Sequence, residues 1–189
     1  MLSIGGKMKE RMLVVLVVTH SRKGFTDSMS KAIAEGATSL SNVRSVIKRV
    51  NEVTAEDLAE ANGIAFGSPI YMAHISGELK HFLDNAYYKF AKFGKTNPKI
   101  NKLYHKPAVA FVSGRTKGFK YKRYEFRPVG LLELEDYLFN YLHMKRAVNG
   151  VHLIRETLET REVTSKQAEL LRNIGKKLAE ECQHVSIAS

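Results

Sequence analysis

A short aliphatic run near the N-terminus, followed at once by a polar turn and an amphipathic segment, constrains the fold most. Residues 14–18 (VVLVV) are continuously apolar and mostly β-branched. A run of this length is too short for a membrane span, and it predicts a strand buried on both faces, as in a parallel sheet. After the turn, Met29, Ile33 and Ala37 recur at helical spacing. The chain therefore opens with a strand, a polar loop and a helix.

The polar loop has the composition of a phosphate-binding turn. Its hydroxyls, cations and glycine are Thr19, Ser21, Arg22, Lys23, Gly24 and Thr26. Hydroxyls and backbone N–H groups donate to phosphate oxygens, and a helix N-terminus adds about half a positive charge. Gly24 permits a backbone turn that a Cβ would hinder. The loop lacks both G-x-x-x-x-G-K-[ST] and G-x-G-x-x-G, so an ordinary connection with serine and threonine caps is the alternative interpretation.

The rest of the chain alternates between strand and helix patterns. Strands are expected at residues 43–50, 63–67, 107–112 and 147–153, and helices after Thr54, over 77–93, over 131–142 and over 165–183. Thr54 and Asp57 have the spacing of a capping box. This alternation predicts a single α/β domain at residues 11–189, a doubly wound five-stranded parallel sheet with helices on both faces. Residues 1–10 are expected to form a flexible tail.

Three loops of unusual composition follow the first, third and fourth of these strands. They comprise residues 19–26, 68–76 and 113–129. In a doubly wound sheet, ligands bind beyond the carboxyl ends of the strands, where these loops meet. The sequence therefore predicts one site at that edge, for a phosphate and a planar ligand.

Composition limits the kinds of binding partner and the cellular compartment that are expected for this chain. The formal net charge of +11 favours acidic or phosphorylated partners. Cys182 is the only cysteine, which excludes an intramolecular disulfide and predicts a reducing, cytoplasmic setting. The sequence has no apolar run of about 20 residues and no signal-peptide core at its start. We expect no metal, because His81 beside Glu78 and Asp84 is typical of a salt-bridged surface.

Two of the loops resemble those of the flavodoxin-like superfamily, and most closely those of its NAD(P)H-dependent FMN reductases and quinone reductases. The family's first loop typically reads S-x-x-G-x-T, which Ser21, Gly24 and Thr26 match. Its second loop typically reads G-[ST]-P-x-Y, then S-G/A before a helix ending in F-[LI]-D; the matching residues are Gly67, Ser68, Pro69, Tyr71, Ser76, Gly77, Phe82, Leu83 and Asp84. The resemblance covers about the whole chain in element order.

The resemblance implies FMN as cofactor and NAD(P)H as co-substrate, with hydride passing through FMN to a quinone or another small acceptor. The implied FMN-binding residues of the first loop are Ser21, Arg22, Lys23, Gly24, Phe25 and Thr26. Those of the second and third loops are Ser68, Pro69, Ile70, Tyr71, Met72, Ala73, His74, Ser113, Gly114, Arg115, Thr116, Lys117 and Gly118. No catalytic side chain is required beyond FMN, although His74 could donate a proton.

Other features of the sequence keep two further functions open. Cations follow Gly114 where these reductases usually have small residues, and electron-carrying flavodoxins are usually acidic, so an FMN electron-transfer protein for an acidic redox partner is the second hypothesis. The third is nucleic-acid binding, because residues 115–127 interleave six cations with four aromatic residues. The aromatic-rich segment 82–93 also predicts a homodimer, with Tyr87 or Tyr88 near the interface.

Overall fold

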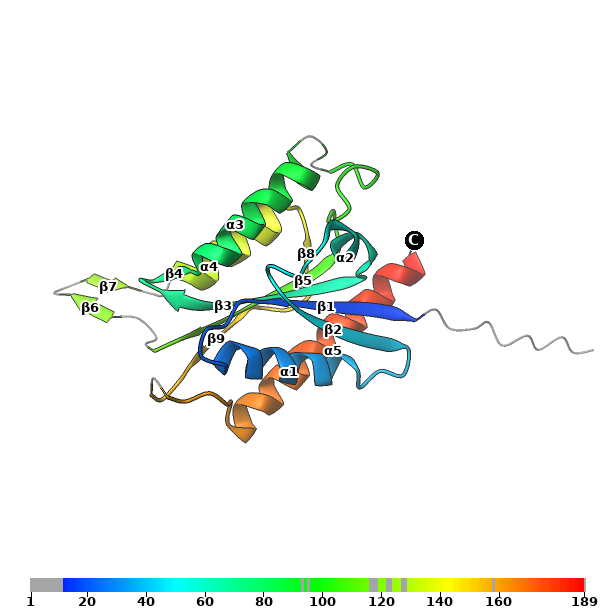
Figure 1. Ribbon diagram of the computed structural model, residues 1–189. Helices are drawn as coiled ribbons and strands as arrows, with labels where there is room; N and C mark the ends of the chain where they lie inside the picture. The colour runs from blue at the N-terminus through cyan, green and yellow to red at the C-terminus, as the bar shows by residue number, and fades with distance from the viewer. Residues whose placement is uncertain are drawn as a thin grey trace, which may run out of the picture.

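The computed structural model describes residues 12–92, 94, 96–115, 119–121, 124–126, 129–157 and 159–188. Its centre is a sheet whose main strands are parallel and run in the order β2-β1-β3-β5, with β9 next to β5 (Figure 1). The bounds are β1 Leu13–Thr19, β2 Val43–Arg49, β3 Gly63–Tyr71, β5 Pro107–Gly114 and β9 Val151–Ile154. The chain crosses from β2 past β1 to β3, which is the doubly wound arrangement that the sequence predicts.

The sheet contains seven strands rather than the expected five, because short pieces complete it. β4 (His74–Ile75) pairs antiparallel with the end of β3. The fifth strand, predicted at residues 147–153, is observed as β9, and the short strand β8 (Lys145–Arg146) precedes it; both pair with β5. Between these two pieces the N–H of Gly150 donates to the carboxylate of Glu135 at 3.2 Å instead of to the sheet.

Helices cover both faces of the sheet (Figure 1). Their bounds are α1 Phe25–Ala37, α2 Ala55–Glu60, α3 Gly77–Ala86, α4 Val129–Asp136 and α5 Ser165–Ala188. One core joins α1 and α5 to side chains of β1 such as Val15 and Val17. The other joins α2, α3 and α4 to Leu16 and Val18. Both faces of β1 are therefore buried, which explains its continuous apolar run.

Two of the predicted helices change type before they end. α3 continues as the π-helix η1 (Tyr87–Ala91), and α4 continues as the π-helix η2 (Tyr137–Tyr141). The two π-helices meet where the rings of Tyr87 and Tyr141 contact edge to face, with centroids 6.2 Å apart. The predicted helices over residues 77–93 and 131–142 thus each comprise an α-helical and a π-helical part.

The third predicted loop contains a two-stranded antiparallel ribbon, β6 (Phe119–Tyr121) and β7 (Tyr124–Phe126). The predicted tail at residues 1–10 lies outside the described residues. Within the described part of the chain, no helix is long and apolar enough to cross a membrane.

α1 and α5 cross at two glycines, each of which faces the backbone of the other helix. A Cβ on Gly36 would lie 1.9 Å from the carbonyl oxygen of Arg172. A Cβ on Gly175 would lie 1.9 Å from the carbonyl oxygen of Ile33. Such contacts are impossible in a close-packed interior, so a larger residue at either position would push the two helices apart.

Candidate functional site

The first loop turns sharply from β1 into α1 at a left-handed glycine. Gly24 has φ 96° and ψ −24°. Its N–H donates to Ser21 Oγ at 3.1 Å, and its carbonyl accepts from the N–H of Ser28 at 2.9 Å. Residues with a Cβ rarely adopt this backbone conformation. The turn therefore requires the glycine that the sequence motif places there.

The N-terminus of α1 has no cap from its own side chains, unlike those of α2 and α3. The N-cap residue of α1 is Gly24, which has no side chain with which to cap the helix. In α2 the predicted capping box between Thr54 and Asp57 is confirmed, and in α3 the hydroxyl of Ser76 accepts from the N–H of Leu79 at 3.2 Å. First-turn N–H groups have no partner within a helix. Those of α1 therefore remain available to an anion.

Arg49, at the end of β2, ties the first loop in place. Its guanidinium donates to the carbonyl oxygen of Ser21 at 2.8 Å and to Asp27 Oδ2 at 2.7 Å. Asp27 lies in the first turn of α1, where its charge alone would oppose a bound anion. Because Arg49 pairs with Asp27, it offsets that charge and fixes the loop at once. Sequence analysis did not identify Arg49, since it lies far from the loop in the sequence.

Two buried polar atoms at the end of β1 have no hydrogen-bond partner. They are Thr19 Oγ1 and His20 Nε2. A buried polar atom without a partner costs free energy, so such atoms are uncommon in folded proteins. Burial lowers the pKa of His20 from 6.5, against the opposing charge of Glu78. By strand alternation Thr19 lies on the face of β1 that packs against α1, whereas His20 Nε2 faces Glu78 of α3.

The second loop is a tight hairpin rather than an irregular loop. β3 extends to Tyr71, and the chain turns at Met72 and Ala73, whose φ angles are 48° and 71°. A two-residue hairpin turn with positive φ at both positions is of type I′, which usually selects Asn or Gly. Backbone strain of this kind is concentrated at functional sites. The side chain of Met72 is 94% exposed at the tip.

The start of α4 supports this strained turn. The N–H of Gly130 donates to the carbonyl oxygen of Ala73 at 2.8 Å. The carboxylate of Glu133 accepts from the N–H of Ile75 at 3.1 Å and contacts His74 Nδ1 at 3.3 Å. A Cβ on Gly130 would lie 3.2 Å from the backbone of His74. Gly130 and Glu133, neither of which the sequence motifs include, therefore hold the hairpin.

Inside the hairpin, the hydroxyl of Ser68 is used by the loop itself. It donates to the carbonyl oxygen of Pro69 at 2.8 Å and accepts from the N–H of Ser76 at 2.9 Å. Ser68 and Pro69 are buried, whereas Tyr71 is 38% exposed. The outward-facing part of the second loop thus begins at Ile70, and its predicted ligand contacts stay a prediction.

A charged cluster joins the first loop to the second. Glu78 lies in the first turn of α3. Its carboxylate is 3.5 Å from Arg22 Nη2 and 3.8 Å from His20 Nε2. The guanidinium of Arg22 in turn lies 5.6 Å from the centre of the Tyr71 ring. Burial raises the pKa of Tyr71, so its hydroxyl is protonated at neutral pH. The structure therefore brings two of the three predicted loops into contact.

The third loop meets the first through a buried hydroxyl pair. Thr26 Oγ1 and Ser113 Oγ are 2.9 Å apart. Beyond Gly114 the described side chains are few: Arg115 is exposed, and Thr116, Lys117 and Gly118 lie outside the described residues. Phe25 is buried, so only its backbone can face a ligand.

His152 on β9 is a further residue that sequence analysis did not identify. A Cβ on Gly114 would lie 2.7 Å from His152 Nε2. This nitrogen is buried without a hydrogen-bond partner, and burial lowers the pKa of the ring. No sequence motif marks His152, because the pairing of β9 with β5 alone brings it to the third loop.

Metal-ligating side chains do not gather at this edge. Across the described ranges, no group of three or more His, Cys, Asp or Glu side chains could hold a metal ion. His81, considered above beside Glu78 and Asp84, instead contacts Asn85 Nδ2 at 3.1 Å. The site therefore offers hydroxyls, backbone N–H groups, cations and aromatic rings.

Comparison with protein families gives one match that covers most of the chain. The family model described as NADPH-dependent FMN reductase matches residues 12–135. This segment contains all of the first and second loops and extends into α4.

Individual proteins show a similar picture. A flavodoxin of Aquifex aeolicus (strain VF5) is 42% identical over 71 residues, which span 38% of this chain and 38% of that protein. A flavodoxin from the domain Archaea has a TM-score of 0.66 at 21% identity, covering 91% of this chain and 100% of that one. A flavodoxin, WrbA-like protein from Agrobacterium tumefaciens has a TM-score of 0.67 at 20% identity, covering 91% and 98%. The structural matches establish a flavodoxin-like fold.

Proposed function

The chain belongs to the NADPH-dependent FMN reductase family, and from this premise we propose that it passes hydride from NAD(P)H through FMN to a quinone or another small acceptor. The family and the flavodoxin relatives make it an FMN-binding, flavodoxin-like oxidoreductase. When bound, FMN accepts hydride from a reduced nicotinamide and releases electrons singly or in pairs. The protein's own residues must bind the cofactor, orient it and leave one face open.

We assign the FMN phosphate to the N-terminus of α1. The observation that carries the proposal is the structure of this helix end. The helix start lacks a side-chain cap, and Gly24 allows the chain to curl around an anion. The unpartnered Thr19 Oγ1 would gain an acceptor from a polar ligand there. Arg22 and Lys23 are exposed beside the same turn and add positive charge. These groups fit a phosphate monoester.

The ring of FMN would lie between the second and third loops. The hairpin from Ile70 to Ile75 would supply backbone groups to its polar edge, and Tyr71 would flank it. Glu133 and Gly130 hold the hairpin to α4, so the ring would rest against a rigid support. The side chain of His74, which is 61% exposed beside Glu133, would be a group able to deliver a proton to an acceptor.

Electron transfer to an acidic protein is the second candidate function. Met72 is 94% exposed at the hairpin tip. Arg22 and Lys23 are exposed in the neighbouring first loop, but Glu78 and Glu159 lie near them, so the support for an acidic partner is the net charge of +11. Nucleic-acid binding would depend on residues 115–127, most of whose side chains lie outside the described residues. Its support therefore comes from sequence composition alone.

We also propose that the protein forms a homodimer. Tyr88 on η1 is 59% exposed and Tyr141 on η2 is 49% exposed, and both π-helices lie on the same face. The rings of Tyr88 and Tyr141 both contact the ring of Tyr87, and exposed aromatic side chains that gather in this way are typical of an interface. Light scattering at tens of micromolar should give twice the monomer mass; a monomer would contradict this proposal.

Native mass spectrometry followed by anaerobic stopped-flow mixing tests the function directly. The purified protein should release FMN on denaturation, and NADH or NADPH should bleach the flavin absorbance in a single turnover. A reoxidation step with menadione should then restore the oxidised spectrum. FMN that neither nucleotide reduces, but that a chemical reductant does, would favour the electron-transfer alternative.

A further inference from the structure

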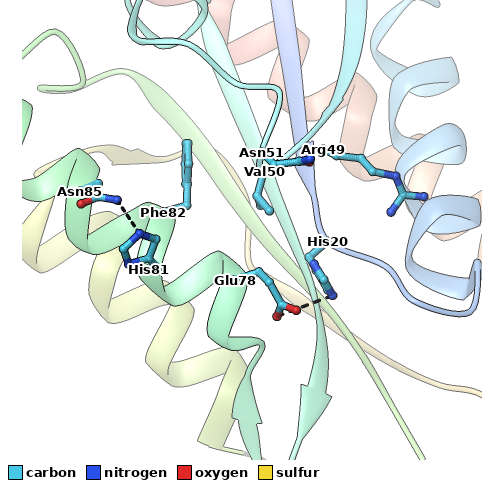
Figure 2. A pocket seen from close by; sticks show the side chains of 8 residues that line it. All are labelled: His20, Arg49, Val50, Asn51, Glu78, His81, Phe82 and Asn85. Carbon is cyan, nitrogen blue, oxygen red and sulfur yellow. Dashed lines mark hydrogen bonds and ion pairs between the residues drawn. The ribbon is translucent and has the colours of Figure 1, made fainter.

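A groove runs along α3, on the side that faces the turn between β2 and α2. Its larger part is a cavity of about 500 Å³ that Figure 2 shows from close by. A second cavity of about 240 Å³ continues it between α2 and the end of α3. The two cavities share Phe82 and Asn85 as lining residues. Together they have the size of a small-molecule site.

The two ends of the groove differ in chemistry. The end near the first loop is lined by His20, Arg49, Asn51, Glu78 and His81, with Val50 among them. The far end is lined mainly by apolar side chains, namely Val53, Ala55, Leu58, Ala86 and Phe90, together with Thr54 and Lys89. Phe82 lines both cavities and therefore stands between the two parts. The groove therefore changes from polar to apolar along its length.

At the polar end, hydrogen-bonding groups remain without partners. His20 Nε2 is buried and makes no hydrogen bond, although Glu78 lies 3.8 Å from it (Figure 2). No side-chain hydrogen bond of Asn51 occurs in the described part of the chain. Because burial lowers the pKa of His20, its ring is neutral at pH 7 and can donate or accept. A polar ring in the cavity would satisfy these groups.

The groove is distinct from the expected flavin site but adjacent to it. Its lining includes neither Pro69 and Tyr71 of the second loop nor Ser113 of the third. Arg22 nevertheless links the two regions, since it contacts both Glu78 and the Tyr71 ring. A ligand head at the polar end would therefore lie one layer of side chains from the expected ring.

We propose that this groove binds a neutral amphipathic ring compound. Its planar, hydrogen-bonding head lies between His20 and Phe82, and its apolar chain extends past Ala55 toward Phe90. A dinucleotide fits less well, because the Glu78 carboxylate faces the cavity and Arg49 is already bonded to Asp27 and Ser21. The groove is a binding site separate from the proposed hydride transfer, because that step requires the acceptor to contact the flavin ring.

Calorimetric titration of the FMN-loaded, oxidised protein, without NAD(P)H, tests the site with two probes. The probes are menadione and a menadione that carries one prenyl chain. Burial of a methylene contributes roughly 0.8 kcal/mol, so the chain should tighten binding by about tenfold or more. Equal affinity for the two probes would overturn the proposal.

A matched pair of substitutions on α2 locates the chain. Ala55→Trp should fill the apolar end and abolish the advantage of the prenyl chain, while menadione binds as before. Ala59→Trp, on the exposed side of the same helix, should change neither affinity. If Ala55→Trp does not fold, Val53→Glu places a charge at the same end and should have the same effect. If the prenylated probe still binds more tightly than menadione in both the Ala55→Trp and the Val53→Glu variants, the proposal is contradicted.

Two further measurements separate this inference from the proposed function. Adenosine monophosphate should not displace menadione; displacement would identify the groove as a nucleotide site instead. NADPH oxidation with ferricyanide as acceptor reports on flavin reduction without the groove. If NADPH oxidation with ferricyanide fails, the proposed function is contradicted. A difference in affinity between the two probes would then still support the groove as a binding site.

Discussion

α1 and α3 begin at the same edge of the sheet, yet their N-termini are built differently. At α3, Ser76 caps the helix, and its own N–H is bonded to Ser68. At α1, the residue in the capping position is Gly24, in a left-handed conformation and without a side-chain bond. The chain completes one helix end by itself and leaves the other incomplete.

The acidic residues of the two first turns reinforce this difference. Asp27 of α1 is paired with Arg49, so its charge does not repel an anion at the helix start. Glu78 of α3 instead reaches toward His20 and Arg22, and thus joins the two loops. An uncapped helix end usually lowers stability; here the protein keeps one where we propose that the FMN phosphate binds.

The largest expected effect comes from removing hydroxyls at the open helix end. Ser21→Ala with Thr26→Ala should lower FMN affinity at least tenfold, since hydrogen bonds to a charged group contribute roughly 1.5 to 3 kcal/mol each. Fluorescence titration of FMN measures the affinity. Because Thr26 also bonds to Ser113, Thr26→Ser serves as the control that keeps the hydroxyl.

The capped helix α2 provides the opposite control for this experiment. Thr54→Ala removes a capping box and should cost about 1 kcal/mol of unfolding free energy, with FMN affinity unchanged. Unchanged affinity in the double alanine variant of the first loop would show that the phosphate binds elsewhere.

A substitution at the left-handed glycine should have the next largest effect. Gly24→Ala forces a side chain into a backbone conformation that costs about 1 to 3 kcal/mol, so both the melting temperature and FMN affinity should fall. Gly77→Ala, at the start of α3, is the matched control. A Cβ there meets nothing within 4 Å, so the variant should be as stable as the wild type or more so. Equal behaviour of the two variants would remove the distinction between the helix ends.

Loss of the Arg49 contacts should have a moderate effect. Arg49→Gln frees the first loop and leaves the charge of Asp27 uncompensated, so FMN affinity should fall severalfold, and more at low salt. Lys48→Gln on the same strand breaks a pair with Asp57 instead and should leave FMN affinity unchanged. Isothermal titration of FMN at two salt concentrations compares the two variants. An equal loss of FMN affinity in both would mean that Arg49 acts only through its positive charge and not through its contacts with the first loop.

The smallest expected effect is on the pH dependence of stability. Burial lowers the pKa of His20 below 6.5 in the folded state, so the unfolded chain binds more protons and stability falls as pH drops below 6.5. His20→Gln should flatten this decline, as should His152→Gln, whose pKa burial also lowers.

Bound FMN should distinguish these two histidines. A phosphate near His20 favours its charged form, so FMN should weaken the acid sensitivity contributed by His20 and leave that of His152. Urea titrations between pH 5 and 7 measure both. An FMN effect of equal size in the two variants would contradict a phosphate near His20.

Features that depend on neighbouring residues could be predicted from the sequence, and those that depend on distant contacts could not. The aliphatic run of β1 and the Thr54 capping box are local patterns, and both are confirmed. Arg49 and Glu133 reach the site from other elements, so no local motif marks them. The hairpin at Met72 and Ala73 lacks the Asn or Gly of such turns, because α4 stabilises it from outside.

The crossing of α1 and α5 has a consequence for the evolution of cofactor affinity. Gly36 is twelve residues from Gly24, about 18 Å along the helix axis. Because the two glycines let the backbones touch, they set how far α1 can slide along its axis, and hence where its first turn meets a bound phosphate. Selection for altered FMN retention should therefore recover changes at Gly36 and Gly175, at the opposite end of α1 from the proposed phosphate site. A substitution at this crossing should therefore change both the docking of the C-terminal helix α5 and the retention of FMN.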